Sequence, residues 1–294
     1  MASFYRERSW LLRQIHPENG VRWGTDPDIC DPDAIAKTAE RIGLLFGRGR
    51  WFDLEVEGLT ALPPAPAMLV SNHSGGTMVP DAWGFAIGWH RHFGGERLLR
   101  IAAHEIILST PLTGRYFGRR GIIRAHRDVT ERTLRSGYDV MIMPGGDQDV
   151  WRPHRDRYRV QFAGRKGYAR LAILSQVPVV PVAHDGPHDT LYVLTDGRPI
   201  AKALRLYPLI RASVWPIHLS LPWGLALGPL PHLPLPTKFR YRVGPAIIPP
   251  PSNGGEPSPE DVADLDREVR AAVQHLLDEL RGSSRARHSE GANA

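Results

Sequence analysis

The stretch AMLVSNHSGG, residues 67–76, decides the fold. It starts as a short apolar run, the pattern of a strand that is buried on both faces, and it ends in Asn72-His73, a serine and two glycines. Residues 140–143 (VMIM) have the same pattern and end at Pro144-Gly145-Gly146, and residues 177–182 read VPVVPV. Three such runs predict the centre of a parallel sheet.

Helical patterns separate these strands, and alternating ones flank them. Helices are predicted over residues 32–47, after Pro80, and over residues 128–136 and 165–175, while residues 51–57 and 239–243 alternate as half-exposed strands. We therefore predict an α/β fold: a single domain with a largely parallel mixed sheet flanked by helices, plus an amphipathic N-terminal helix and a C-terminal helix. Ligands of such sheets bind at the carboxyl ends of the strands, where the Asn72-His73 and Pro144–Gly146 loops fall.

The composition divides the chain into four segments. We expect an N-terminal helical segment over residues 1–44, the α/β domain over 45–250, a linker and helix over 251–281, and a disordered tail over 282–294. Within the domain, residues 204–238 carry seven prolines, many leucines, Trp215 and Trp223. This composition predicts either an irregular segment packed on the core or a flap that faces a membrane or an acyl chain.

Positive charge is concentrated in the middle of the chain. The net charge is +6, but residues 91–170 hold 17 basic and 8 acidic side chains, most of the basic ones arginine. Arginine suits bidentate phosphate recognition, so this segment favours an anionic lipid surface or a phosphorylated substrate, unless it is simply a solvated surface. With no zinc-finger spacing and no RNA-recognition aromatic motif, we expect no nucleic-acid partner.

Other classes are excluded by what the sequence lacks. A single cysteine, Cys30, excludes an intramolecular disulfide framework and a multi-thiolate metal site, and we expect no metal. The start MASFYRERSW has no apolar region of a signal peptide, and no stretch reaches the ~20 apolar residues that span a bilayer. We therefore expect a soluble or membrane-surface protein of the cytoplasm.

His73 is the strongest candidate for a catalytic residue. It follows a buried strand, and the glycines beside it allow the backbone to approach a substrate. An imidazole oriented by a carboxylate is a standard general base. Asp81 is the nearest acid downstream; Pro80 places it in the first turn of a helix, where an acid also stabilises the helix by itself.

The order of these motifs resembles the glycerolipid acyltransferase superfamily, nearest to its diacylglycerol acyltransferase-like branch. The four shared blocks are Asn72-His73 with a following acid, an arginine-rich segment, Pro144-Gly145-Gly146 and VPVVPVA, and the branch also shares Arg165-Lys166-Gly167-Tyr168. The resemblance covers roughly residues 45–250. Each block alone is common, but four in this order are specific.

The sequence departs from the family pattern in places. The family has its acid five residues after the histidine, where Met78 stands here, so the partner role goes to Asp81. The arginine of the second block lies six residues after a glycine, which fits both Arg124 and Arg127. Asp149 lies where the branch usually has glutamate.

The resemblance implies transfer of an acyl group from acyl-CoA or acyl carrier protein to a glycerolipid hydroxyl, as in phospholipid biosynthesis. It implies His73 as general base and Asp81 as the residue that orients it, with no cofactor besides the donor itself. The implied substrate-binding residues are Asn72, Ser74, Gly75, Gly76, Arg124, Arg127, Pro144, Gly145, Gly146, Asp149, Arg165 and Lys166. The implied place of work is an anionic membrane surface, peripheral at the inner face of the cell membrane.

Two other functions stay open. The same site could pass the acyl group to water, as a thioesterase or lipid hydrolase does. The protein could also bind lipid on this fold without catalysis, because its acid is displaced from the family position.

Overall fold

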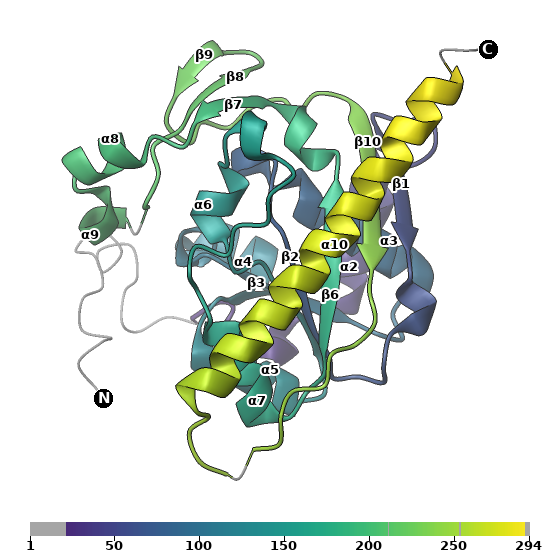
Figure 1. The fold of residues 1–294 in the computed structure, drawn as a ribbon, viewed down its shortest axis with the longest axis vertical. Coiled ribbons are helices and arrows are strands. Elements are labelled where there is room, and N and C mark those ends of the chain that lie inside the picture. Colours follow the sequence, from purple (N-terminus) through teal and green to yellow (C-terminus); the bar gives the residue numbers. More distant parts are fainter. Residues whose placement is uncertain (1–21, 211, 253, 292–294) are drawn as a thin grey trace.

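The computed structural model describes residues 22–210, 212–252 and 254–291, which form an α/β fold (Figure 1). Among these residues, seven strands form one sheet in the order β1-β10-β6-β2-β5-β3-β4. They are β1 (Phe52–Glu57), β2 (Met68–Ser71), β3 (Leu99–Ala103), β4 (Ile122–Arg124), β5 (Asp139–Ile142), β6 (Val179–Asp185) and β10 (Thr237–Val243). All neighbours are parallel except β10 and β6. The predicted fold class is confirmed.

Helices cover both faces of this sheet. Those described are α2 (Pro32–Gly43), α3 (Pro80–Phe93), α4 (Pro111–Gly118), α5 (Arg127–Arg135), α6 (Gly146–Val150), α7 (Gly167–Ser175), α8 (Arg198–Ala203), α9 (Leu206–Ile210) and α10 (Pro259–Gly291). The long helix α10 crosses one face diagonally, and α5 and α7 lie on that same face (Figure 1). Helix α3 packs on the opposite face, with α2 beside it.

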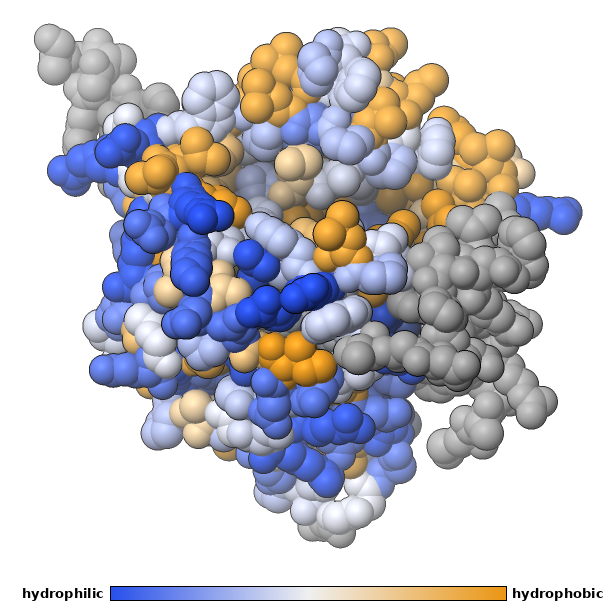
Figure 2. Space-filling model, turned by 180° about the vertical axis from the view of Figure 1, so that it is seen from behind, coloured by the Kyte–Doolittle hydropathy of each residue, from blue (hydrophilic) through white to orange (hydrophobic). Residues whose placement is uncertain are grey.

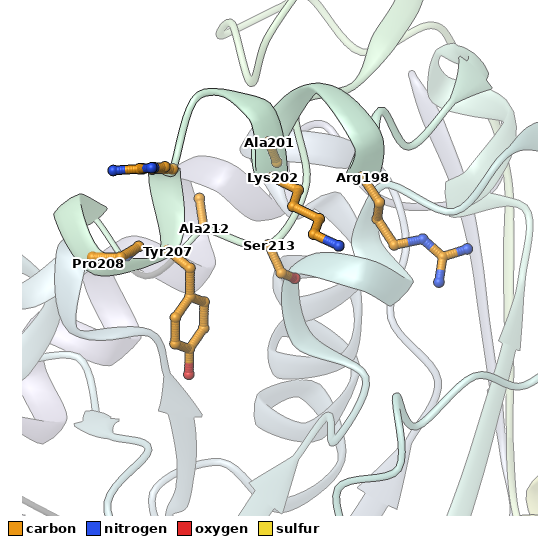
Figure 3. Close-up of a pocket in the computed structure, with 8 residues that line it drawn as sticks. Arg198, Ala201, Lys202, Tyr207, Pro208, Ala212 and Ser213 are labelled. Atoms are coloured by element: carbon orange, nitrogen blue, oxygen red, sulfur yellow. The ribbon is translucent and has the colours of Figure 1, made fainter.

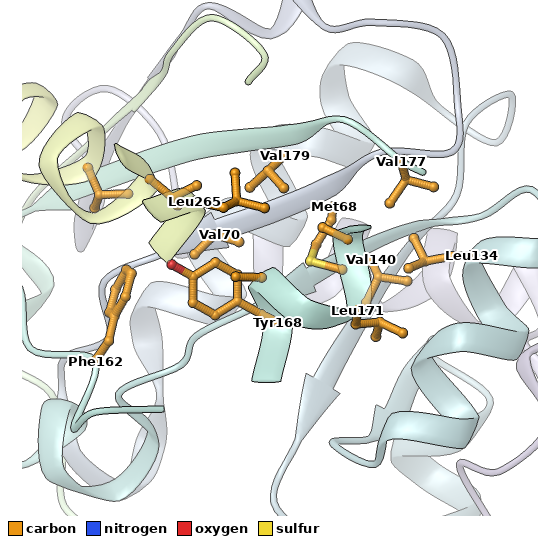
Figure 4. Packing of buried hydrophobic residues seen from close by; sticks show 14 of the residues in the cluster. Met68, Val70, Leu134, Val140, Phe162, Tyr168, Leu171, Val177, Val179 and Leu265 are labelled. Atoms are coloured by element: carbon orange, nitrogen blue, oxygen red, sulfur yellow. The ribbon is translucent and has the colours of Figure 1, made fainter. Parts of the chain in front are cut away.

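The central strands bury side chains on both faces, as their apolar runs predict. Met68 and Val70 of β2 point into the core beneath α7 and α10, where Tyr168 and Leu265 pack (Figure 4). Leu69, between them, points to the core on the opposite face. Alternation of this kind follows from the two-residue period of a strand.

The position of β2 brings three loops together. This strand lies between β6 and β5, both parallel to it, and Ser71 at its end pairs with Val182. The chain therefore leaves β2, β5 and β6 at the same edge of the sheet, which is where ligands bind in such folds.

Residues 204–238 are more regular than the sequence indicates. Strands β8 (Ile217–Ser220) and β9 (Gly224–Leu227) pair antiparallel, and β7 (Tyr192–Thr195) joins them in a separate sheet. The prediction of an irregular segment is therefore wrong. The prediction rested on the many prolines of this segment. Pro216, Pro222 and Pro229 all lie outside the strands, where proline removes no hydrogen bond between strands.

Other differences concern element ends and short strands. Strands β3 and β4 were not predicted from the sequence. Strand β4 has three residues, which is too short to show an alternation of apolar and polar side chains. Helix α2 ends at Gly43 rather than near residue 47. Helix α10 continues to Gly291, beyond the predicted end at residue 281. Residues 1–21 of the predicted N-terminal segment and residues 292–294 lie outside the described residues.

The described part of the chain has no helix that is both long and apolar enough to cross a membrane.

A buried ion pair between Arg97 and Asp139 lies where strand β5 begins. Asp139 of β5 accepts hydrogen bonds from the Arg97 guanidinium at 2.5 and 2.8 Å and from the backbone N–H of Ala67 at 2.9 Å. Its side chain is 1% exposed. We expect Asp139→Ala to lower the free energy of unfolding by about 3 kcal/mol, because the Arg97 charge and a backbone N–H lose their partner together.

Chemical denaturation measures this loss. Asp53→Ala is the matched control, since Asp53 is 34% exposed and its nearest cation, Lys238, lies 3.7 Å away. The control is expected to cost less than about 1 kcal/mol. Equal losses in the two variants would show that the Asp139 pair contributes no more than a surface contact.

Candidate functional site

The loop after β2 brings an acid back to His73. Gly75 and Gly76 have φ angles of 97° and 65°, in the left-handed region that favours glycine. A Cβ on Gly75 would lie 2.5 Å from the ring of Pro80, so the loop folds directly against the start of α3. This tight return explains how Asp81, eight residues after His73, reaches it.

His73 and Asp81 form a hydrogen-bonded pair. Nδ1 of His73 lies 2.6 Å from Oδ2 of Asp81, which also accepts the backbone N–H of Ser74 at 2.8 Å. Burial by itself lowers the pKa of His73, but the charge of Asp81 and its hydrogen bond outweigh burial and raise it. For Asp81 burial raises the pKa, and the attraction of His73 outweighs it, so that the pKa falls.

Two residues from other strands surround the pair. The hydroxyl of Tyr241, on β10, donates to the backbone carbonyl of Asp81 at 2.8 Å. Nε2 of His184, at the end of β6, lies 2.8 Å from the Ser74 hydroxyl and 3.6 Å from the Asp81 carboxylate. Burial lowers the pKa of His184 to about 4, so this second imidazole is neutral at pH 7 and leaves the negative charge of Asp81 to His73.

Asn72 joins two strand ends. Its amide nitrogen donates to the backbone carbonyl of His184, and its amide oxygen accepts the backbone N–H of His184, both at 3.0 Å. The side chain is 1% exposed. The amide of Asn72 therefore holds the β2 and β6 ends in register and supports the loop that carries His73.

Asp149 supports His73 from the opposite side. Its Oδ2 accepts the backbone N–H of His73 at 2.7 Å, and its Oδ1 forms an ion pair with Arg152. Both charged side chains are fully buried. Burial raises the pKa of Asp149 to about 6 even with Arg152 beside it. Asp149 is thus engaged with the backbone of the histidine loop rather than open to a substrate.

One nitrogen of His73 stays available. The side chain is 14% exposed, and Nε2 has no hydrogen-bond partner among the described residues. With Nδ1 bound to a carboxylate, an imidazole can take a proton at Nε2 from a group in front of it.

The Pro144–Gly146 loop lies beside this site and is itself held in place. A Cβ on Gly145 would lie 2.2 Å from both Cβ of Asp149 and the backbone oxygen of Gln161, so only glycine fits. The N–H of Gly146 donates to the Met143 carbonyl at 3.1 Å, so this N–H is engaged within the loop rather than with a substrate. Arg165 donates to the carbonyls of Pro144 and Gly145 at 3.2 and 2.9 Å.

The remaining predicted cations lie apart from His73. Strand β4 is three strands from β2, roughly 14 Å at the usual spacing. Arg124 at its end is 1% exposed and donates to the backbone carbonyls of Trp23 and Leu108. Arg127 is 43% exposed and lies 3.7 Å from Glu256. Lys166 is exposed at the start of α7. The structure therefore does not bring Arg124 and Arg127 to the histidine.

Three residues of the site escaped sequence reasoning: His184, Tyr241 and Arg152. A signal existed for His184, because it directly follows the apolar run of a strand predicted to lie beside β2. No local pattern marks Tyr241, which reaches Asp81 across 160 residues. As for metals, the described residues contain no group of three or more histidine, cysteine or acidic side chains that could hold an ion.

The fold and this site define an α/β protein with a carboxylate-oriented histidine at the carboxyl end of a central strand. Residues 53–185 match the family model named Acyltransferase. This part of the chain is therefore similar to the acyltransferase family.

Several known proteins are similar to the chain. An uncharacterized protein of Mycobacterium tuberculosis is 29% identical over 230 residues, which is 77% of this chain and 61% of that protein's length. The "DGAT1/2-independent enzyme synthesizing storage lipids" of Gallus gallus is 25% identical over 92% of this chain and 72% of its own. The crystal structure of the 1-acyl-sn-glycerophosphate (LPA) acyltransferase PlsC from Thermotoga maritima covers 85% of this chain and 79% of its own, with 18% identity and a TM-score of 0.48. These values are too low to transfer function from PlsC.

The carboxylate of Asp81 should control the titration of His73. We expect the pKa of His73 to lie above the ordinary histidine value in the unmodified protein and to fall in Asp81→Asn, because the charge and hydrogen bond of Asp81 then no longer outweigh burial. NMR titration of the histidine rings, with the His73 signal assigned from a His73→Gln spectrum, measures both values. Asp53→Asn, on a distant strand, serves as control and should leave the pKa unchanged. The same pKa in the Asp81 variant would contradict the electrostatic coupling.

Proposed function

We propose that this protein is an O-acyltransferase that moves an acyl group from a thioester, acyl-CoA or acyl carrier protein, to the hydroxyl of a glycerolipid. The observation that carries the proposal is the 2.6 Å contact of His73 with Asp81 inside a domain of the acyltransferase family. No other cofactor takes part in the proposed reaction.

The proposed mechanism uses the free nitrogen of His73. The neutral imidazole takes the proton of the acceptor hydroxyl at Nε2, while the hydroxyl oxygen attacks the thioester carbonyl. Asp81 stabilises the imidazolium that forms. When the tetrahedral intermediate collapses, the C–S bond breaks and the departing thiolate takes the proton back from Nε2, which gives an ester and a free thiol. No acyl group is attached to the protein.

The raised pKa of His73 gives this mechanism a pH dependence. Only the neutral imidazole accepts a proton, so transfer should increase as the pH rises through the pKa of His73. The midpoint of this increase in kcat/KM should lie above the ordinary pKa of histidine.

Removal of the imidazole tests the proposed base. We expect His73→Ala to reduce acyl transfer from labelled acyl-CoA to a glycerolipid by about 10²- to 10⁴-fold, the usual contribution of a general base. His275→Ala is the matched control, because His275 is 74% exposed on α10. Undiminished transfer in His73→Ala would exclude this role.

The same assay separates the alternatives. An acyltransferase releases thiol in proportion to the acceptor, and the ester appears at the same rate. Equal thiol release with and without acceptor would identify a thioesterase or hydrolase, and lipid binding without thiol release would identify a non-catalytic protein.

We further propose that the sheet β7–β8–β9 rests on the membrane. Leu219 of β8 pairs with Tyr192 of β7 on one side and Leu225 of β9 on the other, and their side chains are 45, 46 and 63% exposed. The alternate residues Val193, His218 and Ala226 are buried. The outer face is therefore a continuous apolar surface, extended by Leu194, Leu221, Trp223 and Leu227.

The shape and position of this apolar surface favour contact with a lipid bilayer. Hydrophobic side chains gather along the upper edge of the molecule, the end where β7, β8 and β9 lie (Figure 2). Exposed tryptophan and leucine are typical of a surface that contacts a membrane interface. Moreover, the hydroxyl of Thr77, four residues after His73, donates to the Pro229 carbonyl at 2.8 Å, so the surface is coupled to the catalytic loop.

Charges placed on this face should remove membrane binding. We expect Leu225→Glu combined with Leu227→Glu to lower the partition onto phosphatidylcholine–phosphatidylglycerol vesicles at least tenfold, because two apolar side chains leave the interface. Vesicle sedimentation measures the partition. Leu112→Glu with Ile248→Glu, two exposed sites outside this sheet, is the matched control. An unchanged partition, or a change of oligomeric state in sedimentation equilibrium instead, would contradict the membrane proposal.

A further inference from the structure

We propose that Arg152 is a positioning residue of the histidine site: its buried guanidinium keeps Asp149 ionised, and the ionised carboxylate holds the backbone of His73 in place. The effect on the histidine loop stands on the geometry of these three residues. The effect on turnover rests on the proposed acyl transfer.

One carboxylate joins the guanidinium to the histidine loop. Asp149 lies in the last turn of α6, and Arg152 follows three residues later, which places the two side chains on the same side. The guanidinium donates through one terminal nitrogen to Oδ1 of Asp149 and through the other to the backbone carbonyl of Arg157 at 3.1 Å. Oδ2 of Asp149 accepts the N–H of His73 at 2.7 Å. The two oxygens therefore bind two different segments.

Neither charge of this pair has an alternative partner. Both side chains have no exposed surface, so water does not replace the contact. Asp149 is the one carboxylate that forms an ion pair with Arg152 among the described residues, and Nε of Arg152 is buried without an acceptor there. Removal of either side chain therefore leaves the other charge buried and uncompensated.

The ionisation of Asp149 depends on Arg152. Burial raises the pKa of this carboxyl, the Arg152 charge is the largest effect that lowers it, and the pKa is about 6 as a result. His73 and Asp81 also face the carboxyl and act on its pKa in opposite directions. Without Arg152 the carboxyl would be protonated at pH 7. A neutral carboxyl accepts a weaker hydrogen bond than a carboxylate, so the His73 loop would lose support.

The other groups near the guanidinium do not take over its role. Burial lowers the pKa of His184 to about 4 and that of His188 well below its usual value, and the charge of Arg152 contributes to both effects. These imidazoles are therefore uncharged at pH 7. Arg157 places its own guanidinium over the ring of Tyr158, 4.7 Å from the ring centre.

The other acid of α6 is directed away from the histidine. Asp147 accepts hydrogen bonds from the backbone N–H and the hydroxyl of Ser213, both at 2.6 Å, and from Arg165 at 2.8 Å. Ser213 lies in the wall of a surface hollow beside α8 and α9 (Figure 3). Asp149 is therefore the acid of α6 that supports His73.

NMR titration of Asp149 tests the proposal without turnover. The carboxyl carbon signal, assigned from its absence in Asp149→Asn, is followed together with the His73 N–H signal. We expect both to change with a midpoint near pH 6 in the unmodified protein, and about two pH units higher in Arg152→Gln, because burial then acts without its main opponent. Arg152→Lys, which retains the charge, should lie between them. An unchanged midpoint in Arg152→Gln would overturn the proposal.

The matched control breaks another buried ion pair. Arg97→Gln leaves Asp139 without its partner at the start of β5, the end of the strand away from His73. We expect this variant to lose stability in chemical denaturation and to keep the Asp149 midpoint. A midpoint that moves equally in both variants would show that general loosening, rather than the Arg152 charge, controls Asp149, and would overturn the proposal.

The pH profile of kcat connects this titration with acyl transfer. With a midpoint two units higher, roughly a tenth of Asp149 is ionised at pH 7. We therefore expect Arg152→Gln to lower kcat about tenfold at pH 7, with little change in KM, and to regain activity towards pH 9. A loss of kcat that is equal at every pH would identify a purely structural role for Arg152 and would overturn the proposal.

A double variant covers the case in which Arg152→Gln does not fold. Asp149→Leu with Arg152→Met replaces both charges by apolar side chains, a change that buried ion pairs often tolerate. We expect transfer at least tenfold slower at every pH, because the N–H of His73 has no acceptor, and unchanged transfer would overturn the proposal. If the Asp149 midpoint moves as expected but the unmodified protein transfers no acyl group, the proposed function fails and the role of Arg152 in the loop stands.

Discussion

The buried carboxylate of Asp81 is the constraint on which the rest of the site depends. An ionised side chain with no exposed surface is costly unless hydrogen bonds and an opposite charge compensate it. Asp81 receives that compensation from His73, from the N–H groups of Ser74 and Ala82, and from the start of α3 on which it lies. These partners come from both sides of one glycine loop, so the loop, the helix and the charge can only form together.

A parallel sheet explains why the supporting residues converge. Asn72 follows β2, His184 ends the neighbouring β6, and Asp149 follows β5 on the other side. Each strand delivers one side chain to the same edge, and each side chain binds the backbone or a side chain of the segment that follows another strand. The antiparallel β10 adds Tyr241 from within its length rather than from its end, and its hydroxyl reaches the backbone of Asp81. Contacts from the ends of β2, β5 and β6 and from β10 thus fix the orientation of the His73 ring.

Much of this edge could be predicted from the sequence, and the reasons are local. The apolar run before Asn72 shows a strand, and Pro80 shows where the helix begins, so Asp81 was within reach of His73 in any compact loop. Arg124 shows where such reasoning ends. Its spacing after a glycine marks it as a candidate ligand, yet whether its guanidinium meets a substrate or the carbonyls of Trp23 and Leu108 depends on packing between segments 101 and 16 residues apart. Tyr241 was not predicted for the same reason, because no local sequence pattern indicates a contact made across the sheet.

Helix α6 has a role that neither its length nor its sequence indicates. Its two acids point in different directions: Asp147 to Ser213 and Arg165, Asp149 to His73 and Arg152. Glycine at 145 allows the second acid to lie against the preceding loop, and Arg165 fixes that loop by its carbonyls. A displacement of α6 would therefore change the orientation of the histidine. Buried and charge-assisted contacts hold both acids of α6, so this short helix keeps the backbone of the histidine loop in a fixed position relative to β5.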